Sequence, residues 1–331
     1  MNQITIVYFT EGGHALAEQV ARILGCAAKR PKSGQLMTEI AQLFHECDAL
    51  VFIGACGIAV RAIAPLLEDK TRDPAVVVMD ECGQYVISLL SGHIGGANHL
   101  ARRIAGITGG KAVITTATDV NRRFSIDTWA VQSGCDIESM EMAKRFSAEI
   151  LKRDLPFCTD FPVTGALPSG LFAACEGDIG AAITYRTDFA PFAKTLQLIP
   201  RILYLGIGCR RGTTEKAIEI AVQRVMDVGG LNPRALKGIA TIDVKRDEQG
   251  LLAFASEWHL PLMFFSAQEL QNASGEFSSS SFVEQTVGVD NVCERAAICA
   301  AGENAVLLAR KTVGDGVTVA IAQEKWRVCF G

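Results

Sequence analysis

The sequence predicts an α/β protein: two Rossmann-like α/β domains with mostly parallel sheets, joined by a small α+β middle module. Three observations support this prediction. Short apolar runs alternate with segments of helical periodicity in the first and last parts of the chain, as in a doubly wound sheet. Between these parts, Gly and Pro residues repeatedly interrupt the pattern. The length of 331 residues, 49% of them hydrophobic, accommodates about two domains with sizeable cores.

The first part of the chain alternates strand and helix in a regular order. Runs such as 49–53 and 75–79 are short and apolar throughout, which is typical of strands in a buried parallel sheet. Leu16, Val20 and Ile23 have helical spacing. We therefore expect strand 3–9, a turn at Gly12-Gly13, helix 14–24, helix 37–46, strand 49–53, helix 58–66, strand 75–79, its hairpin partner 85–90, helix 96–107 and strand 112–116.

The rest of the chain predicts a middle module followed by another α/β domain. The module contains a helix near 139–151 and strands near 180–185 and 195–200. After it we expect strand 201–208, helix 214–228, strand 237–243, helix 247–258, strand 262–265, a short helix opened by the capping box Ser266–Glu269, a Gly- and Ser-rich surface loop at 275–281, helix 291–301, and strands 304–310 and 316–322. The predicted domains are 1–127, 128–199 and 200–331.

Composition narrows the class of function. Lys plus Arg number 32 and Asp plus Glu number 36, so the net charge of −4 favours neither nucleic acid nor an anionic membrane as a partner. The N-terminus is typical of a strand rather than a signal peptide, and no apolar run of about 18 residues predicts a transmembrane helix. The eleven cysteines contain no CxxC pair, so we interpret them as reduced core thiols of a cytoplasmic protein. No metal-binding motif occurs, and we expect no metal site.

The first segment with functional potential runs from Gly54 to Arg61, directly after strand 49–53. Glycine at such a position lets backbone N–H groups approach an anion at the start of a helix. We therefore consider Gly57 and Arg61 as substrate-binding candidates. A tight strand–helix turn explains the same residues, and the segment matches neither a Walker A loop nor GxGxxG.

The second segment spans residues 80–98. His93 lies between glycines and outside any apolar periodicity, which leaves an imidazole free for acid–base chemistry near neutral pH. Asp80 and Glu81 follow a strand and are candidates for orienting it. A solvent-facing loop histidine and an ordinary turn aspartate are the simpler alternatives. The candidates for substrate binding here are Ser91, Gly92, Gly95, Gly96 and Asn98.

The third segment contains Thr116, Thr118 and Asp119 at the end of strand 112–116. Hydroxyls and a carboxylate at a strand end can hold polar groups of a substrate, although threonine also suits strands and helix caps. All three segments follow strands of the first predicted sheet. We therefore expect them to converge at one edge of that sheet.

The fourth segment contains Gly208, Arg210, Arg211 and Thr213, directly before helix 214–228. Two arginines and the free N–H groups of a helix start predict a cradle for carboxylate or phosphate. The third glycine is one place late for a dinucleotide fingerprint, and a purely structural turn is the alternative.

Several of these strings together resemble a known family. The run GACGIAVRAIAPLLEDKTRDPAVVVMDECGQYVISLLSGHIGGANHLARRIAG, followed by VITTATD, resembles the N-terminal region of the CbiG family, the cobalt-precorrin 5A hydrolases of anaerobic cobalamin (vitamin B12) biosynthesis. The strings LGIGCRRGTTEKAI, TVGVDNVCERAAICAAG and GVTVAIA resemble the C-terminal domain of the same family. The resemblance extends over nearly the whole chain, in the order of the family.

The resemblance implies a substrate and a reaction. The substrate is cobalt-precorrin 5A, a cobalt-containing macrocycle with acetate and propionate arms and a ring-A δ-lactone. The reaction opens the lactone and releases a two-carbon fragment as acetaldehyde, which gives cobalt-precorrin 5B. The resemblance implies no cofactor on the protein, since the substrate carries the cobalt.

The types and positions of the residues then lead to roles in that reaction. We expect His93 to act as general base for water, oriented by Asp80 or Glu81. The backbone between Gly92 and Gly96 would stabilise the oxyanion, while Asp119 and Thr116 hold the substrate or move a second proton.

Other classes of function stay open at this point. A corrinoid carrier without catalysis needs the arginine-rich loop but not His93. A scaffold in a pathway complex predicts an exposed apolar patch. A nucleotide-binding oxidoreductase fits the alternating pattern but lacks the fingerprint. We expect no nucleic acid or membrane partner, and a homodimer or transient contact with other pathway enzymes stays open.

Overall fold

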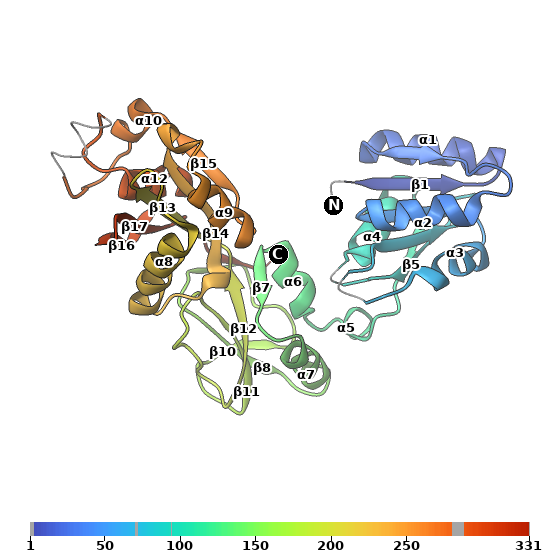
Figure 1. The fold of residues 1–331 in the computed structure, drawn as a ribbon. Coiled ribbons are helices and arrows are strands. Elements are labelled where there is room, and N and C mark those ends of the chain that lie inside the picture. Colours follow the sequence, from blue (N-terminus) through green and yellow to red (C-terminus); the bar gives the residue numbers. More distant parts are fainter. Residues whose placement is uncertain (1–2, 70–71, 94, 280–287, 331) are drawn as a thin grey trace. The chain divides into compact units, whose positions relative to one another are not determined.

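The structure of the chain is a computed structural model. It describes residues 3–69, 72–93, 95–279 and 288–330. The chain divides into two compact units, Met1–Val131 with Ser147–Arg153 and Gln132–Phe146 with Asp154–Gly331. Each unit has mixed α/β structure with mostly parallel sheets, which confirms the predicted fold class (Figure 1). The finer division into 1–127, 128–199 and 200–331 stays a prediction.

The first unit is built on a six-stranded sheet. Its strands are β1 (Ile4–Tyr8), β2 (Ala27–Lys29), β3 (Ala49–Ile53), β4 (Ala75–Met79), β5 (Tyr85–Leu90) and β6 (Lys111–Val113), in the order β2-β1-β3-β4-β5-β6. The strands β1 to β4 are all parallel. β5 pairs antiparallel with β4, and β6 pairs parallel with β5. The last two strands therefore run opposite to the first four.

Helices cover both faces of this sheet (Figure 1). They are α1 (Glu11–Leu24), α2 (Leu36–Glu46), α3 (Cys56–Ile63) with the 3-10 turn η1 (Ala64–Leu66), and α4 (Ala97–Thr108). The short helices α5 (Ala117–Val120) and α6 (Ile126–Gln132) follow β6 along the chain. One core cluster joins Val20 of α1 and Ile104 of α4 to the sheet, and the other joins Phe44 of α2 to it. Burying each such side chain contributes roughly 1.5–3 kcal/mol to stability.

Local chemistry explains where the elements differ from the sequence pattern. The predicted turn at Gly12-Gly13 is wrong, since both residues lie in the first turn of α1. The Thr10 hydroxyl accepts the Gly13 N–H at 3.1 Å and so starts the helix early. The pattern also does not indicate β2 or α6, because three and seven residues are too few to display a period.

Strand direction decides which loops share an edge of the sheet. The loops that follow β3 and β4, with Gly57 and Asp80, lie at one edge. The loops that follow β5 and β6, with His93 and Asp119, lie at the opposite edge. The expected convergence of all three segments at one edge is therefore wrong, because the β4–β5 hairpin reverses the chain.

The second unit contains two five-stranded sheets and one two-stranded pair. The strands of the first sheet, in the order β10-β8-β11-β12-β7, are β7 (Cys135–Ile137), β8 (Leu155–Thr159), β10 (Leu171–Ala173), β11 (Ile179–Ile183) and β12 (Lys194–Pro200). Those of the second, in the order β15-β14-β13-β17-β16, are β13 (Leu203–Cys209), β14 (Leu236–Ile242), β15 (Leu262–Phe265), β16 (Val306–Gly314) and β17 (Val317–Gln323). β9 (Val163–Thr164) pairs with β18 (Val328–Cys329).

The helices that follow α6 along the chain agree with the sequence pattern. They are α7 (Met140–Ile150), α8 (Glu215–Gly229), α9 (Gln249–Glu257), α10 (Ala267–Gln271) and α12 (Cys293–Ala301), with 3-10 turns η2 (Pro233–Ala235) and η3 (Asp243–Lys245). The predicted capping box at Ser266 and Glu269 is confirmed. Residues 275–279 form a loop as expected, and residues 280–281 lie outside the described residues.

Two cysteines correct the interpretation of all thiols as reduced. Cys158 and Cys175 form a disulfide, with Cα atoms 5.0 Å apart. Cys158 lies on β8, and Cys175 follows β10, its parallel neighbour, so strand pairing brings them together. None of the other nine cysteines of the described chain forms a disulfide. Burial raises the pKa of the Cys135 thiol to about 12, which keeps it in the unreactive protonated form.

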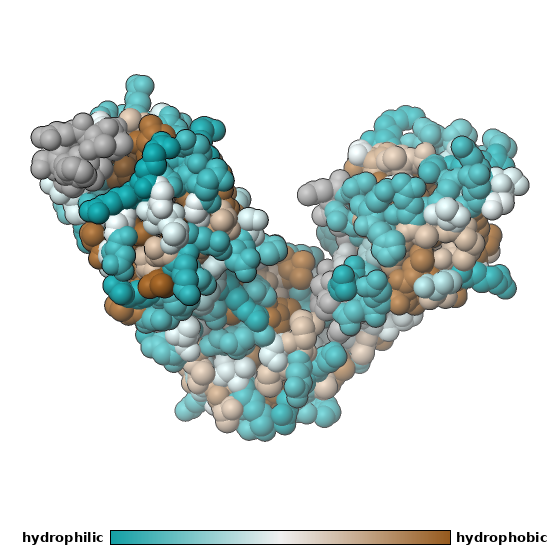
Figure 2. Space-filling model, viewed as in Figure 1, coloured by the Kyte–Doolittle hydropathy of each residue, from teal (hydrophilic) through white to brown (hydrophobic). Residues whose placement is uncertain are grey.

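The surface is largely hydrophilic on the face in Figure 2, with apolar groups among the polar side chains. Exposed apolar residues such as Val228 and Val120 lie singly on helices. No helix within the described ranges is both long and apolar enough to cross a membrane.

Candidate active site

His93 lies in a glycine-rich loop that leads from β5 into α4. Ser91 adopts the left-handed conformation (φ 53°), and its hydroxyl donates to the Asp73 carbonyl at 3.0 Å. A Cβ on Gly95 would lie 2.4 Å from the Ser91 Cβ, and one on Gly92 would lie 2.7 Å from Asn98 Oδ1. The loop therefore needs both glycines in order to fold tightly on itself, and this fold presents His93.

Gly95→Ala is expected to destabilise the protein by roughly 1–3 kcal/mol, because the new Cβ overlaps Ser91. Gly106→Ala is the matched control: this glycine lies within α4 and its Cβ would meet nothing within 4 Å. There we expect a gain of roughly 0.5–1 kcal/mol from helix propensity. Urea denaturation of both variants measures the difference. Equal effects at the two positions would contradict the role of Gly95 in the loop.

The Nδ1 atom of His93 contacts a carboxylate that the sequence analysis did not single out. Asp127, at the start of α6, lies 3.1 Å (Oδ1) and 3.3 Å (Oδ2) from Nδ1. Its Oδ1 also accepts hydrogen bonds from the Ser125 hydroxyl (2.8 Å) and the Thr128 N–H (2.9 Å). Ser125 Oγ itself lies 3.0 Å from Nδ1. These hydrogen bonds hold the Asp127 carboxylate in place beside the imidazole.

The Nε2 atom of His93 contacts two groups on α5. Asp119 Oδ2 and Thr118 Oγ1 each lie 3.2 Å away. Asp119 is in turn surrounded by donors: Oδ2 accepts from Asn98 Nδ2 (2.9 Å) and from the Thr116 hydroxyl, and Oδ1 accepts from Arg102. The Arg102 side chain is 55% exposed, against 17% for Asp119 and 20% for His93. Acidic and basic side chains therefore alternate from Asp127, through His93 and Asp119, to the exposed Arg102.

The two carboxylates set the protonation of the imidazole. The hydrogen bond that His93 donates to Asp127 raises the pKa of His93 above 6.5, and this effect, together with the charges of Asp127 and Asp119, outweighs the burial that lowers it. Burial acts to raise the pKa of Asp119, but hydrogen bonds from Thr116 and Arg102 outweigh it and lower that pKa. The pKa of Asp127 is also lowered, since its contacts with His93 outweigh burial. Both carboxylates thus favour the protonated form of the imidazole.

Backbone strain gathers at the same place. Five described non-glycine residues have positive φ, and two of them are Ser91, beside His93, and Arg122 (φ 52°), between Asp119 and Ser125. Residues held in sparsely populated conformations cluster at functional sites. This observation supports the His93 cluster as a site independently of its charges.

The structure brings together five of the residues that the sequence indicated at this edge. They are His93, Asn98, Thr116, Thr118 and Asp119. The expected oxyanion donors are partly occupied: the Gly96 N–H donates to the His93 carbonyl at 3.0 Å, and the Asn98 N–H donates to the Gly92 carbonyl at 3.0 Å. These two groups hold the loop in shape.

Asp80 and Glu81 do not orient His93, because they lie at the opposite edge of the sheet. The Asp80 carboxylate instead accepts from the N–H groups of Cys82 (2.9 Å) and Tyr85 (2.6 Å) within the β4–β5 turn. Gly57 and Arg61 share that edge on α3, where the Arg61 guanidinium lies 3.5 Å from the Gly57 carbonyl. The sequence prediction that placed these four residues around His93 is corrected by the hairpin.

The arginine-rich loop belongs to the second unit. Its Arg211 pairs with Asp247 at 2.9 Å, and the Gly212 N–H donates to the buried carboxylate of Glu248 at 2.8 Å. The Thr213 hydroxyl donates to the Arg210 carbonyl at 2.7 Å. Carboxylates of the protein thus occupy part of the expected anion cradle, and Gly208 lies against Thr318 of β17.

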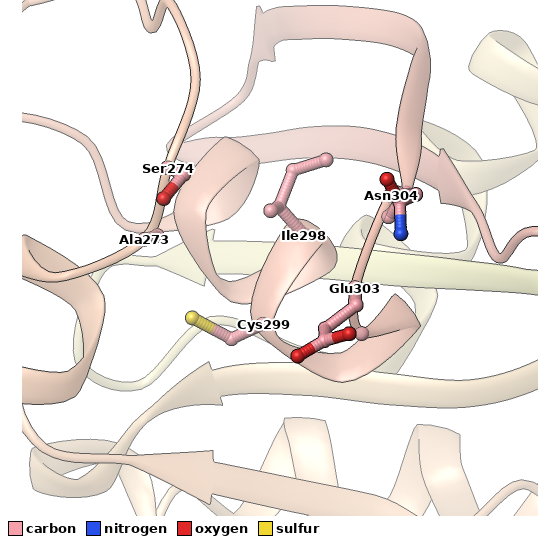
Figure 3. Close-up of a pocket in the computed structure, with 8 residues that line it drawn as sticks. Ala273, Ser274, Ile298, Cys299, Glu303 and Asn304 are labelled. Carbon is pink, nitrogen blue, oxygen red and sulfur yellow. The ribbon is translucent and has the colours of Figure 1, made fainter.

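The second unit also has an open pocket of about 580 Å³ beside α12 (Figure 3). Ser274, Cys299, Glu303 and Asn304 contribute its polar groups. Burial raises the pKa of the Cys299 thiol, and the thiol donates to the Glu269 carbonyl at 3.7 Å. A protonated, hydrogen-bonded thiol is a poor nucleophile. The residues that line this pocket also include no histidine, unlike the His93 cluster.

Sequence reasoning missed Asp127, Ser125 and Arg102. Ser125 and Asp127 immediately precede and begin a seven-residue helix, and only a hydroxyl and a carboxylate shortly after Asp119 hinted at them. Arg102 lies one helical turn after Asn98 on α4, so helical spacing places both on one face.

This arrangement can perform acid–base chemistry. An imidazole held by a carboxylate on Nδ1 and facing a hydroxyl on Nε2 has the contacts of a general base with its orienting group. A network of donors keeps the second carboxylate charged. An exposed guanidinium at the outer end can bind an anionic substrate.

Comparisons with known proteins identify the family of the chain. The family model described as Cobalamin synthesis G N-terminal matches residues 38–119, and the one described as Cobalamin synthesis G C-terminus matches residues 203–322. The cobalt-precorrin-5A hydrolase of Salmonella typhimurium is 36% identical over 342 residues, covering 96% of this chain and 97% of its own. The cobalt-precorrin-5A hydrolase of Priestia megaterium is 33% identical over 309 residues, covering 88% and 82%.

A solved structure is similar over the full length as well. The crystal structure of a cobalamin biosynthesis protein G homologue from Sulfolobus solfataricus covers 98% of this chain and 97% of its own, with 24% identity and a TM-score of 0.45. The chain is an enzyme of the hydrolase class with an α/β fold. The chain belongs to the CbiG family of cobalt-precorrin-5A hydrolases, as the resemblance of its sequence strings indicated.

Proposed function

We propose that this chain hydrolyses the ring-A δ-lactone of cobalt-precorrin 5A and releases acetaldehyde, giving cobalt-precorrin 5B. The observation that carries the proposal is the 36% identity to the Salmonella typhimurium hydrolase over nearly the full length of both chains. The His93 cluster supports it, because lactone hydrolysis needs a base for the attacking oxygen and an acid for the leaving oxygen.

The chain's residues then take the following roles. Neutral His93 removes the proton of the attacking oxygen through Nε2, while Asp127 on Nδ1 orients the ring and stabilises the imidazolium that forms. His93 returns that proton to the leaving ring oxygen, so lactone and water become a carboxylic acid and an alcohol. Loss of the alcohol proton then drives C–C cleavage, in which acetaldehyde leaves and the electron-poor macrocycle takes the electron pair.

The direct test is anaerobic incubation of the purified protein with cobalt-precorrin 5A, with chemical trapping of acetaldehyde. Release together with the lactone-opened corrinoid is the expected result. Tight binding without release would indicate a carrier and overturn the hydrolase proposal. If the protein neither binds cobalt-precorrin 5A nor releases acetaldehyde, this corrinoid is not its substrate.

Arg102 is expected to bind a carboxylate arm of the substrate. Its guanidinium is 55% exposed and donates one bond to Asp119, which leaves further N–H groups toward solvent. Arg102→Ala should raise KM by roughly 10- to 100-fold, the value of a charged hydrogen bond, and change kcat less. Arg103→Ala, an exposed neighbour on the same helix, is the control and should leave both constants unchanged. A lower kcat at constant KM would instead place Arg102 in the chemistry.

Three further features complete the proposal. We propose that the enzyme acts without a cofactor of its own, since cobalt arrives with the substrate. We also propose a cytoplasmic location and either a homodimer or transient contact with other enzymes of the pathway. We propose that the chain has no nucleic-acid partner, since its net charge of −4 does not attract a polyanion. Light scattering of the pure protein tests the dimer.

A further inference from the structure

We propose that the hydroxyl of Thr118 is the nucleophile that opens the lactone, in a Thr118–His93–Asp127 triad. This inference rests on the proposed function, because it names the first attacking group of that reaction. The contacts are Thr118 Oγ1 to His93 Nε2 at 3.2 Å and His93 Nδ1 to Asp127 Oδ1 at 3.1 Å. A hydroxyl, an imidazole and a carboxylate in this order form the arrangement that cleaves esters, and a lactone is a cyclic ester.

The partners of Nε2 identify Thr118 as the proton source. Asp119 and Thr118 are the two side chains in contact with Nε2 among the described residues. Asp119 is a carboxylate surrounded by donors, so it has no proton to give. When His93 is protonated, Nε2 donates to Asp119. When His93 is neutral, with its proton on Nδ1 toward Asp127, Nε2 accepts a proton only from the Thr118 hydroxyl.

The step balances through an acyl-enzyme. The Thr118 proton moves to Nε2 as Oγ1 forms a bond to the lactone carbonyl carbon. The ring C–O bond breaks, and the leaving oxygen takes the proton from His93. Water then gives its proton to His93 and adds to the same carbon; the Oγ1–carbon bond breaks, and Thr118 regains its proton. Because the lactone is cyclic, the leaving oxygen stays attached to the macrocycle in the first step. The intermediate therefore carries the whole substrate.

Burial of Thr118 fits a nucleophile that is uncovered by its substrate. Thr118 is 5% exposed, whereas Val120 on the same single-turn helix α5 is 64% exposed. Bulk water is therefore kept from Oγ1 in the resting state. The 20% exposure of the His93 side chain marks the side from which the substrate approaches Oγ1.

The test compares Thr118→Ala, Thr118→Ser and the control Thr38→Ala, an exposed threonine on α2. We expect Thr118→Ala to lower lactone opening at least about 100-fold with corrinoid binding unchanged, since the reacting hydroxyl is lost. Thr118→Ser keeps the hydroxyl and should stay within about 10-fold of the parent. Acid-quenched single turnovers, measured by intact mass, should show protein plus one substrate, absent in Thr118→Ala. Full activity of Thr118→Ala, or a Thr118→Ser that is active without any adduct, would overturn the proposal.

A second probe separates this proposal from the reaction itself. The parent protein is treated with p-nitrophenyl acetate, and acetylated peptides are mapped. Acetyl on Thr118 that disappears in His93→Gln supports the triad, even where cobalt-precorrin 5A is not converted and the proposed function fails. Acetaldehyde release with no acyl group on Thr118 from either probe retains the proposed function and overturns the triad. Failure of both readouts overturns both.

Discussion

Replacing His93 with glutamine should lower acetaldehyde release by roughly 100- to 10,000-fold, the usual contribution of a positioned acid–base group. Glutamine keeps hydrogen-bonding atoms near Asp127 and Asp119 but cannot accept and return a proton at neutral pH. The imidazole contacts both carboxylates, the Thr118 hydroxyl and Ser125, so its loss removes the group that joins them. Initial rates at saturating substrate measure the effect.

Two controls keep this result specific. His99→Gln changes an exposed histidine on the following helix and should leave the rate unchanged. Binding of the corrinoid, followed by its absorbance, should persist in His93→Gln, because Arg102 still faces the substrate. Turnover close to that of the parent would remove His93 from the chemistry, and a loss of binding with unchanged kcat would make it a binding residue.

The sequence was sufficient to predict those site residues that directly follow a strand and so lie at the edge of the sheet where that strand ends. His93 stands out because its neighbours are glycines, and Thr116, Thr118 and Asp119 stand out because they follow an apolar strand. The predicted hairpin 75–90 already contained the reason why Asp80 cannot join them. A hairpin reverses the chain, so the end of its second strand lies at the edge opposite to the end of its first.

Contacts between distant residues were beyond the sequence pattern. Asp127 meets His93 across 34 positions, and nothing in a seven-residue helix start distinguishes a carboxylate that orients an imidazole from one that caps a helix. The Cys158–Cys175 pair depends in the same way on the pairing of β8 with β10. Gly92 and Gly95 were predicted as substrate-binding residues; the structure provides a packing reason for both glycines, and their contact with substrate stays a prediction.

Asp127→Asn should combine a large loss of rate with a shift of the pH profile. Removing the carboxylate that orients a catalytic imidazole lowers kcat by up to about 10,000-fold in a triad of this kind. Asparagine can also present an N–H to Nδ1, which favours the wrong tautomer. Asp178→Asn is the control, because it breaks an exposed ion pair with Lys194 in the other unit and should leave the profile unchanged.

The direction of the pH shift follows from the base role of His93. Only the neutral imidazole accepts a proton, so activity rises with pH through the pKa of His93, which Asp127 holds above 6.5. Without Asp127 that pKa falls, and the rising limb should move to lower pH even as the maximum rate drops. The interaction also stabilises the fold fully below pH 6.5 and is lost as pH rises through the raised pKa, so the Tm difference between parent and variant should shrink as the pH rises. A slower variant with an unmoved limb would mean that Asp127 supports the loop without setting the charge of His93.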